Sequence, residues 1–102
     1  MAEYELKDVK VAARQLNIEY RGRKVFRDVA NLGYELKEVA DCLSKLTPNE
    51  YRKTHHYDNS PPDDEYICSY VKAEDEKMDE LYVKFCLIDD RSLIDLASFH
   101  LS

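Results

Sequence analysis

Apolar residues recur at helical spacing along the first half of the chain. Gly22 separates the first helical segment from the second, and Gly33 suits the position just after the end of the second. The pattern therefore predicts three amphipathic helices with these apolar positions: Leu6, Val9, Ala13 and Leu16; Val25, Val29 and Leu32; Leu36, Val39, Ala40, Leu43 and Leu46.

The segment TPNE at residues 47–50 has the composition of a capping box, with proline at the first helical position. The Thr47 hydroxyl can accept from one unpaired backbone N–H, and the Glu50 carboxylate can reach back to another. We expect a short helix over about residues 48–53. It would end in the polar stretch YRKTHHYDN, which begins at residue 51.

The apolar period changes to two in the second half of the chain. Strands are predicted for YICSYVK (66–72), LYVKFCLI (81–88) and SLIDLASFHL (92–101), with polar turns at EDEKMDE (74–80) and DDRS (89–92). In the middle strand, Leu81, Val83, Phe85 and Leu87 share one face. Helices followed by strands predict a single α+β domain over residues 1–102, with the helices packed on one face of an antiparallel sheet.

Length and composition exclude several classes of protein. A chain of 102 residues has room for one modest core, and it shows neither a membrane-spanning apolar run nor the order of a signal peptide. Cys42, Cys68 and Cys86 form no CxxC pair, so we expect reduced, buried thiols. We interpret the protein as cytoplasmic, without membrane contact.

The net charge of −6 is distributed unevenly. Residues 1–57 carry 11 Lys and Arg against 9 Asp and Glu, whereas residues 58–102 carry 4 against 12. This balance argues mildly against a nucleic-acid binder. One local basic cluster is still a candidate RNA contact, and it consists of Arg21, Arg23, Lys24 and Arg27. Such a cluster is more commonly the solvated start of a helix.

Tyr82 and Lys84 alternate with the inward residues of the middle strand, so they point to the opposite face. On an open sheet such residues are most often cross-strand packing. A neighbouring strand entered from Lys53 would nevertheless bring further polar groups near them, namely His55 or His56, and His100. RNA cleavage without a metal needs a base, an acid and cations, and Lys, His and Tyr side chains supply all three.

The segments LTPNEYRKTHHYDN and ELYVKFCLIDDRSLIDLASFHL resemble the MqsR family, the motility quorum-sensing regulator toxins. The resemblance extends from about residue 5 to the C-terminus and includes DVANLGYELKEVADCLSKL, YRKT, YVK at 82–84 and the closing Ser98 and Phe99. It implies a RelE-like fold and a ribosome-independent mRNA interferase that a cognate antitoxin neutralises. The family's catalytic lysine and tyrosine fall on Lys53 and Tyr82.

The sequence departs from the family at its catalytic glutamine, whose position falls near Ile67 or Cys68. HHY replaces the family's residues after the lysine, and FHLS replaces a terminal segment that carries another lysine. Two alternatives follow. Either His55, His56 and His100 take over proton transfer, or catalysis is weakened or lost.

Two metal-binding patterns compete with this interpretation. Pro62–Asp63 followed by DEK at 75–77 mimics a magnesium-dependent nuclease motif, but the DEK lies in a polar run between predicted strands, where a turn is expected. His55 and His56 with Asp58 form the second pattern, but adjacent histidines point apart in an extended chain. We therefore expect no metal and no cofactor.

Two function classes remain. The first is a metal-independent endoribonuclease toxin with mRNA as substrate and an antitoxin as partner. In it, the catalytic residues would be Lys53, His55, His56 and Tyr82, and RNA would contact Arg21, Arg23, Lys24, Arg27, Tyr57, Lys84 and His100. The second is an interaction protein that keeps the toxin fold without its catalysis and presents its acidic C-terminal half to a basic partner.

Overall fold

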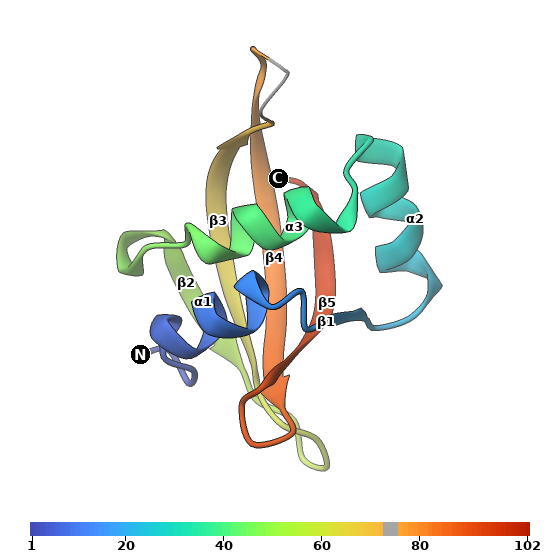
Figure 1. Cartoon of the computed structure of the whole chain (residues 1–102). Helices are drawn as coiled ribbons and strands as arrows, with labels where there is room; N and C mark the ends of the chain where they lie inside the picture. Colours follow the sequence, from blue (N-terminus) through green and yellow to red (C-terminus); the bar gives the residue numbers. More distant parts are fainter. Residues whose placement is uncertain (73–75) are drawn as a thin grey trace.

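The computed structural model describes residues 1–72 and 76–102 of the chain. Helices precede most of the strands, so the predicted α+β class is confirmed (Figure 1). The elements in chain order are α1 Leu6–Arg14, β1 Ile18–Tyr20, α2 Arg23–Leu32, α3 Leu36–Ser44, the 3₁₀ turn η1 Pro48–Glu50, β2 Tyr51–His55, β3 Asp63–Val71, β4 Met78–Ile88 and β5 Leu93–Leu101.

The sheet has the strand order β1-β5-β4-β3-β2 and is mixed. Strands β2 to β5 pair antiparallel, whereas β1 runs parallel to β5. The expectation of a wholly antiparallel sheet is therefore wrong at this edge. Strand β1 has three residues, which is too short for an alternating pattern to show in the sequence.

Helices α1 and α3 cross one face of the sheet, and α2 lies beside β5 at its edge (Figure 1). The core lies between the two layers. The predicted inward face of β4 is confirmed, since Leu81, Val83 and Phe85 are fully buried and Leu87 nearly so. Burying each such side chain contributes about 1.5–3 kcal/mol, so this alternation does much to fix the register of the strand.

The helices are shorter than the apolar pattern predicts. Helix α1 ends at Arg14, because Leu16 takes a left-handed backbone conformation (φ 60°) and leaves its side chain half exposed. Leu36 is also partly exposed, and Leu46 is buried beyond the end of α3. Gly33 occupies the predicted left-handed position after α2 (φ 76°), a conformation that glycine adopts without steric cost.

The expected helix over residues 48–53 is wrong after Glu50. Glu50 does reach back to the Thr47 N–H (2.9 Å), but the helix stops after one 3₁₀ turn. Tyr51 then pairs with Tyr66 of β3, ring against ring at 5.7 Å, and the chain continues as strand β2. The burial of this aromatic pair and the backbone pairing with β3 outweigh the local helix signal.

Further details of the second half also differ from the sequence pattern. Met78–Glu80, expected in a turn, begin β4, while Glu74 and Asp75 of that predicted turn lie outside the described residues. The DDRS turn is confirmed, with positive φ angles from Asp89 to Arg91. The three cysteines are buried free thiols, as predicted. In the described part of the chain, no helix is long and apolar enough to cross a membrane.

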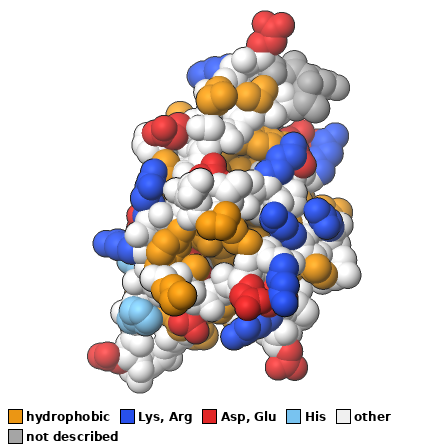
Figure 2. Space-filling model, turned by 90° about the vertical axis from the view of Figure 1, so that its left-hand side faces the viewer, with side chains coloured by type: hydrophobic (Ala, Val, Ile, Leu, Met, Phe, Trp, Pro, Cys, Tyr) orange, Lys and Arg blue, Asp and Glu red, His pale blue; other side chains and the backbone are white. Residues whose placement is uncertain are grey.

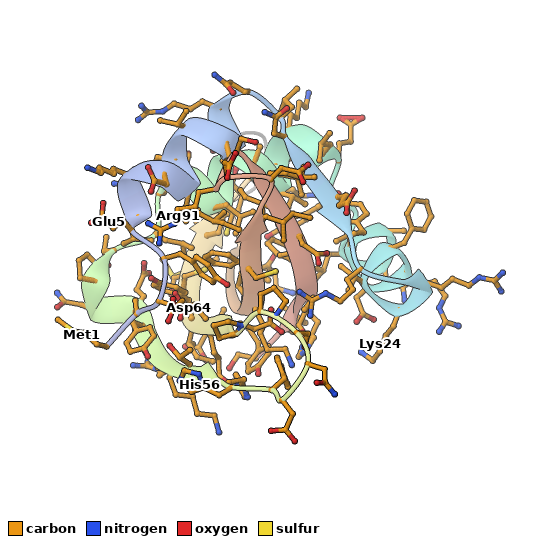
Figure 3. The ribbon with its side chains drawn as sticks, turned by 90° about the horizontal axis from the view of Figure 1, so that it is seen from below. Met1, Glu5, Lys24, His56, Asp64 and Arg91 are labelled. Carbon is orange, nitrogen blue, oxygen red and sulfur yellow. The ribbon has the colours of Figure 1, made fainter. Side chains whose placement is uncertain are left out.

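Asp64 fastens the N-terminal segment to the sheet (Figure 3). Its carboxylate is fully buried and accepts hydrogen bonds from the backbone N–H groups of Glu3 (3.0 Å) and Tyr4 (2.9 Å). The Thr54 hydroxyl of β2 donates a third bond of 2.6 Å. A buried carboxylate needs such donors, and here they join the first residues of the chain to β2 and β3.

Candidate functional site

The sheet face opposite α1 and α3 carries most of the polar groups that the sequence singles out, and we refer to it as the open face. Residues that pair directly across neighbouring strands share a face, so the pairing register groups them in rows. The first row contains Lys53, Glu65, Lys84 and Ser98, and the next contains Ile67, Tyr82 and His100. Residues of β2 and β5 thereby meet across the sheet, although 45 positions separate Lys53 from Ser98.

Tyr82 lies at the centre of this arrangement. Its hydroxyl donates a 2.8 Å hydrogen bond to Glu65 Oε1, and its ring stacks on the His100 imidazole with centroids 5.1 Å apart. Burial, together with the bond to Glu65, raises the pKa of Tyr82 to about 12. The hydroxyl is therefore protonated at neutral pH and can act as a hydrogen-bond donor.

His55 reaches the same carboxylate from strand β2. Its Nε2 lies 2.7 Å from Glu65 Oε1, and the side chains of both residues are mostly buried. Burial alone would raise the pKa of Glu65, but the bonds from His55 and Tyr82 hold that pKa below its usual range. Glu65 is thus an ionised carboxylate shared by an imidazole and a phenol.

Lys53 of β2 and Lys84 of β4 lie directly opposite Glu65 in the strand register, one on each side of it. Lys53 is exposed on the edge strand β2, and Lys84 is half-buried on the central strand β4. Near Glu65, the open face therefore holds two cations, two imidazoles and one phenol. The expectation that Lys53, His55 or His56, Tyr82 and His100 share a surface agrees with this geometry, and of the two adjacent histidines it is His55 that lies there.

Arg21 is engaged by carboxylates instead of lying free in a basic cluster. Its guanidinium donates to both oxygens of Asp63 (2.9 Å each) and to Asp95 (3.1 Å), and one N–H points to Cys86 Sγ at 3.2 Å. Asp63 is fully buried and also accepts from the Tyr57 hydroxyl at 2.9 Å. The bonds to Asp63 raise the pKa of Arg21, so the guanidinium remains charged.

The other three members of the predicted basic cluster lie on two different sides of α2. Lys24 forms an ion pair with Asp28 (2.8 Å) and lines a surface hollow of about 420 Å³ together with His100. Arg23 and Arg27 line another hollow, with Tyr20 and the exposed ring of Phe26. Lys24 therefore adds a cation next to His100, at the β5 side of the open face.

His56 is exposed and follows the end of β2, well apart from Lys24 (Figure 3). Strand geometry directs His55, and not His56, toward Glu65. Of the magnesium-type pattern, Asp63 is bound by Arg21 and Asp75 lies outside the described residues. Within residues 1–72 and 76–102, no three His, Cys, Asp or Glu side chains are grouped to hold a metal ion.

The residue that sequence reasoning missed is Glu65. The alternation of β3 contains a signal for it, because Tyr66, Cys68 and Tyr70 face the core and so turn Asp63 and Glu65 to the open face. That signal depends on knowing that β2 pairs with β3, and the sequence pattern predicted a helix there instead.

The sequence matches a known protein family over almost its whole length. A family described as "Motility quorum-sensing regulator, toxin of MqsA" matches residues 1–100. The chain belongs to the MqsR toxin family. No curated protein matches the chain. The family identifies this member as the toxin of a toxin–antitoxin pair, so an antitoxin is its expected partner.

The structure shows where the position expected to carry a glutamine, Ile67 or Cys68, lies in the sheet. Ile67 pairs with Tyr82 on the open face, whereas Cys68 is buried on the helix side. A residue at position 67 would thus lie beside Tyr82, and here that residue is apolar. The polar partner of Tyr82 comes instead from Glu65, two positions earlier on the same strand.

This MqsR-family chain also has an apolar hollow of about 450 Å³ at the edge formed by β2 and the N-terminal segment. Figure 2 shows hydrophobic side chains gathered on this side of the molecule, with Lys and Arg side chains around them. The lining residues include Met1, Tyr4, Leu6, Pro48 and Tyr51. The hollow lies on the helix side of β2 and is therefore separate from the open face.

Proposed function

We propose that this MqsR-family toxin is an mRNA interferase, a ribosome-independent endoribonuclease that cleaves RNA without a metal ion and acts in the cytoplasm. The observation that carries the proposal is the register of the open face. It groups side chains of three strands around Glu65 of β3: Lys53 and His55 of β2, Tyr82 and Lys84 of β4, and His100 of β5.

These side chains match the requirements of cleavage by 2′-hydroxyl attack. The reaction needs a base for the 2′-hydroxyl proton, an acid for the departing 5′-oxygen and positive charge near the phosphoryl oxygens. Lys53 and Lys84 supply the charge, and the protonated Tyr82 hydroxyl supplies a hydrogen-bond donor. The Tyr82–His100 stack offers a flat surface for an unpaired base.

The acidic composition of the chain does not prevent RNA from approaching this face. Asp63 and Asp95 are both bound to Arg21, and the Glu65 carboxylate is bound by His55 and Tyr82. Each of these negative charges therefore has a neighbouring donor or cation. Further RNA contacts would come from the exposed ring of Tyr57, from Lys24 beside His100, and from Arg23 and Arg27 on the other side of α2.

The experiment compares cleavage of a synthetic single-stranded RNA by the wild type, Tyr82→Phe and Tyr70→Phe. Tyr82→Phe removes only the hydroxyl, so cleavage should fall by about 10²-fold while the fold persists. Tyr70→Phe is the matched control, because the Tyr70 hydroxyl also donates to a carboxylate, that of Asp41, but on the helix side of the sheet. Equal activity in both variants would contradict the role of Tyr82.

One observation favours the second function class, the interaction protein without catalysis. Glu65 engages both the Tyr82 hydroxyl and the His55 ring, so neither group is free in this arrangement. If the purified protein cleaves no RNA but still binds its antitoxin, the fold has kept the partner surface and lost the reaction.

A further inference from the structure

Two histidines on the open face each have one ring nitrogen held by an oxygen that can only accept. His55 Nε2 lies 2.7 Å from the Glu65 carboxylate, and His100 Nδ1 lies 2.8 Å from the Leu101 carbonyl oxygen. The nitrogen in each contact must therefore carry the proton. When the rings are neutral, the lone pair lies on Nδ1 of His55 and on Nε2 of His100.

The two rings are connected through the side chains between them. Glu65 Oε1 accepts from His55 and also from the Tyr82 hydroxyl, and the Tyr82 ring stacks on His100 with an interplanar angle of 10°. This chain of contacts crosses four strands in the order β2, β3, β4 and β5. The shared Glu65 carboxylate positions the His55 ring, and the stack on Tyr82 positions the His100 ring.

We propose that His55 and His100 form the acid–base pair of the reaction and that Glu65 is a positioning residue, which sets the tautomer of His55. The assignment rests on the proposed function. One neutral imidazole takes the 2′-hydroxyl proton while O2′ bonds to phosphorus. The P–O5′ bond breaks, and the other imidazolium gives its proton to O5′. The products are a 2′,3′-cyclic phosphate and a 5′-hydroxyl, and the number of protons is conserved.

The charged surroundings of the two rings differ. His55 faces Glu65 and Asp63 of β3, with Lys53 on its own strand and the Tyr82 phenol beside Glu65. His100 faces Tyr82 on β4 and shares a hollow with Lys24 and Asp28 of α2, which are ion-paired to each other. His55 thus contacts a carboxylate directly, whereas His100 stacks on an aromatic ring.

The experiment measures kcat/KM against pH for the wild type, His55→Gln, His100→Gln and the double variant. The wild type should give a bell-shaped profile, because one ring must be neutral and the other protonated. Each single variant should lose one limb of the bell and about 10²-fold in activity, and the double variant should be little worse than either. His56→Gln is the matched control, since His56 is adjacent in sequence and exposed.

A second measurement tests the positioning role of Glu65. Nitrogen-15 NMR should show His55 as the Nε2–H tautomer in the wild type and as a mixture of tautomers in Glu65→Leu. Glu65→Gln should displace one limb of the pH profile without changing the melting temperature by more than a few degrees. Glu80→Gln, an exposed residue expected on the same face by the alternation of β4, should leave both readouts unchanged.

The outcomes separate this assignment from the proposed function. The histidine pair alone would be overturned if the wild type cleaves RNA and either single histidine variant keeps more than a third of that activity with a complete bell-shaped pH profile. A wild type that cleaves no RNA would overturn both. An Nδ1–H tautomer for His55 would overturn the role of Glu65.

Discussion

Replacing Arg21 with methionine removes the guanidinium and keeps most of the aliphatic stem. In the wild type this guanidinium donates to both oxygens of Asp63 at 2.9 Å, and the Asp63 side chain is 0% exposed. After the substitution, Asp63 keeps one donor, the Tyr57 hydroxyl at 2.9 Å. A buried carboxylate would then lack most of its compensating charge.

The expected loss of stability follows from the burial of the pair. Breaking a fully buried ion pair by removing one partner costs about 3–5 kcal/mol. Here the Arg21 side chain is 40% exposed, so water screens part of the attraction. We expect the free energy of unfolding to fall by about 2–3 kcal/mol at pH 7, a large share of the stability of a small domain.

Urea unfolding followed by circular dichroism measures this loss, and a double-mutant cycle with Asp63→Asn apportions it. The double variant should regain part of the stability, because no buried charge remains unpaired. Burial tends to raise the pKa of Asp63, but bonds from Arg21 and Tyr57 leave it lowered. Stability from this pair is thus complete above the ordinary pKa of aspartate and is lost as pH falls through the lower folded value.

The difference between the wild type and Arg21→Met should therefore shrink in acid. A loss below about 0.5 kcal/mol at pH 7, the usual size for an exposed position, would refute the structural role of Arg21. If RNA affinity fell sharply while stability held, Arg21 would be an RNA contact, as the sequence pattern predicts.

Three further predictions concern the open face. Lys53→Ala should lower RNA cleavage by about 10²-fold with little change in melting temperature. The control Lys37→Ala, on the exposed surface of α3, should leave cleavage unchanged. If Lys53→Ala loses folding and activity together, the role of Lys53 is structural. Cleavage should persist in EDTA and leave 2′,3′-cyclic phosphate ends, and loss on chelation with recovery in Mg²⁺ would contradict the Lys, His and Tyr mechanism. RNA affinity should fall as salt rises, with Glu76→Gln changing it little; affinity independent of salt would refute the basic footprint.

The layers of the fold are predictable from the sequence because burial enforces a period. Val9, Val29 and Leu43 each belong to a different set of apolar residues at helical spacing, and all three are buried. The alternation around Phe85 specifies the inward face of β4. The strand pattern predicts that Lys53 and Tyr82 share a face, and the family resemblance implies their catalytic roles. Local periodicity is therefore enough to predict which residues form the core and which side of the sheet is polar.

Long-range pairing is where the sequence reasoning failed. The capping box at Thr47 has the same local form whether a helix or a strand follows, and the pairing of Tyr51 with Tyr66 decides in favour of the strand. Strand β1 is specified by its contacts with β5, which lies about 76 residues further along the chain. Arg21 follows β1 directly, so its carboxylate partners could not be foreseen without that pairing.

The two carboxylates of β3 on the open face connect stability with the chemistry proposed for it. Asp63 binds Arg21 and Tyr57, and so ties the end of β1 and the segment after His55 to the sheet. Glu65 is next on the same face and holds His55 itself. Loosening the first contact should therefore also displace the imidazole that the second contact orients. We expect Arg21→Met to reduce cleavage at temperatures where the variant is still folded, through a lower kcat and not through weaker RNA binding.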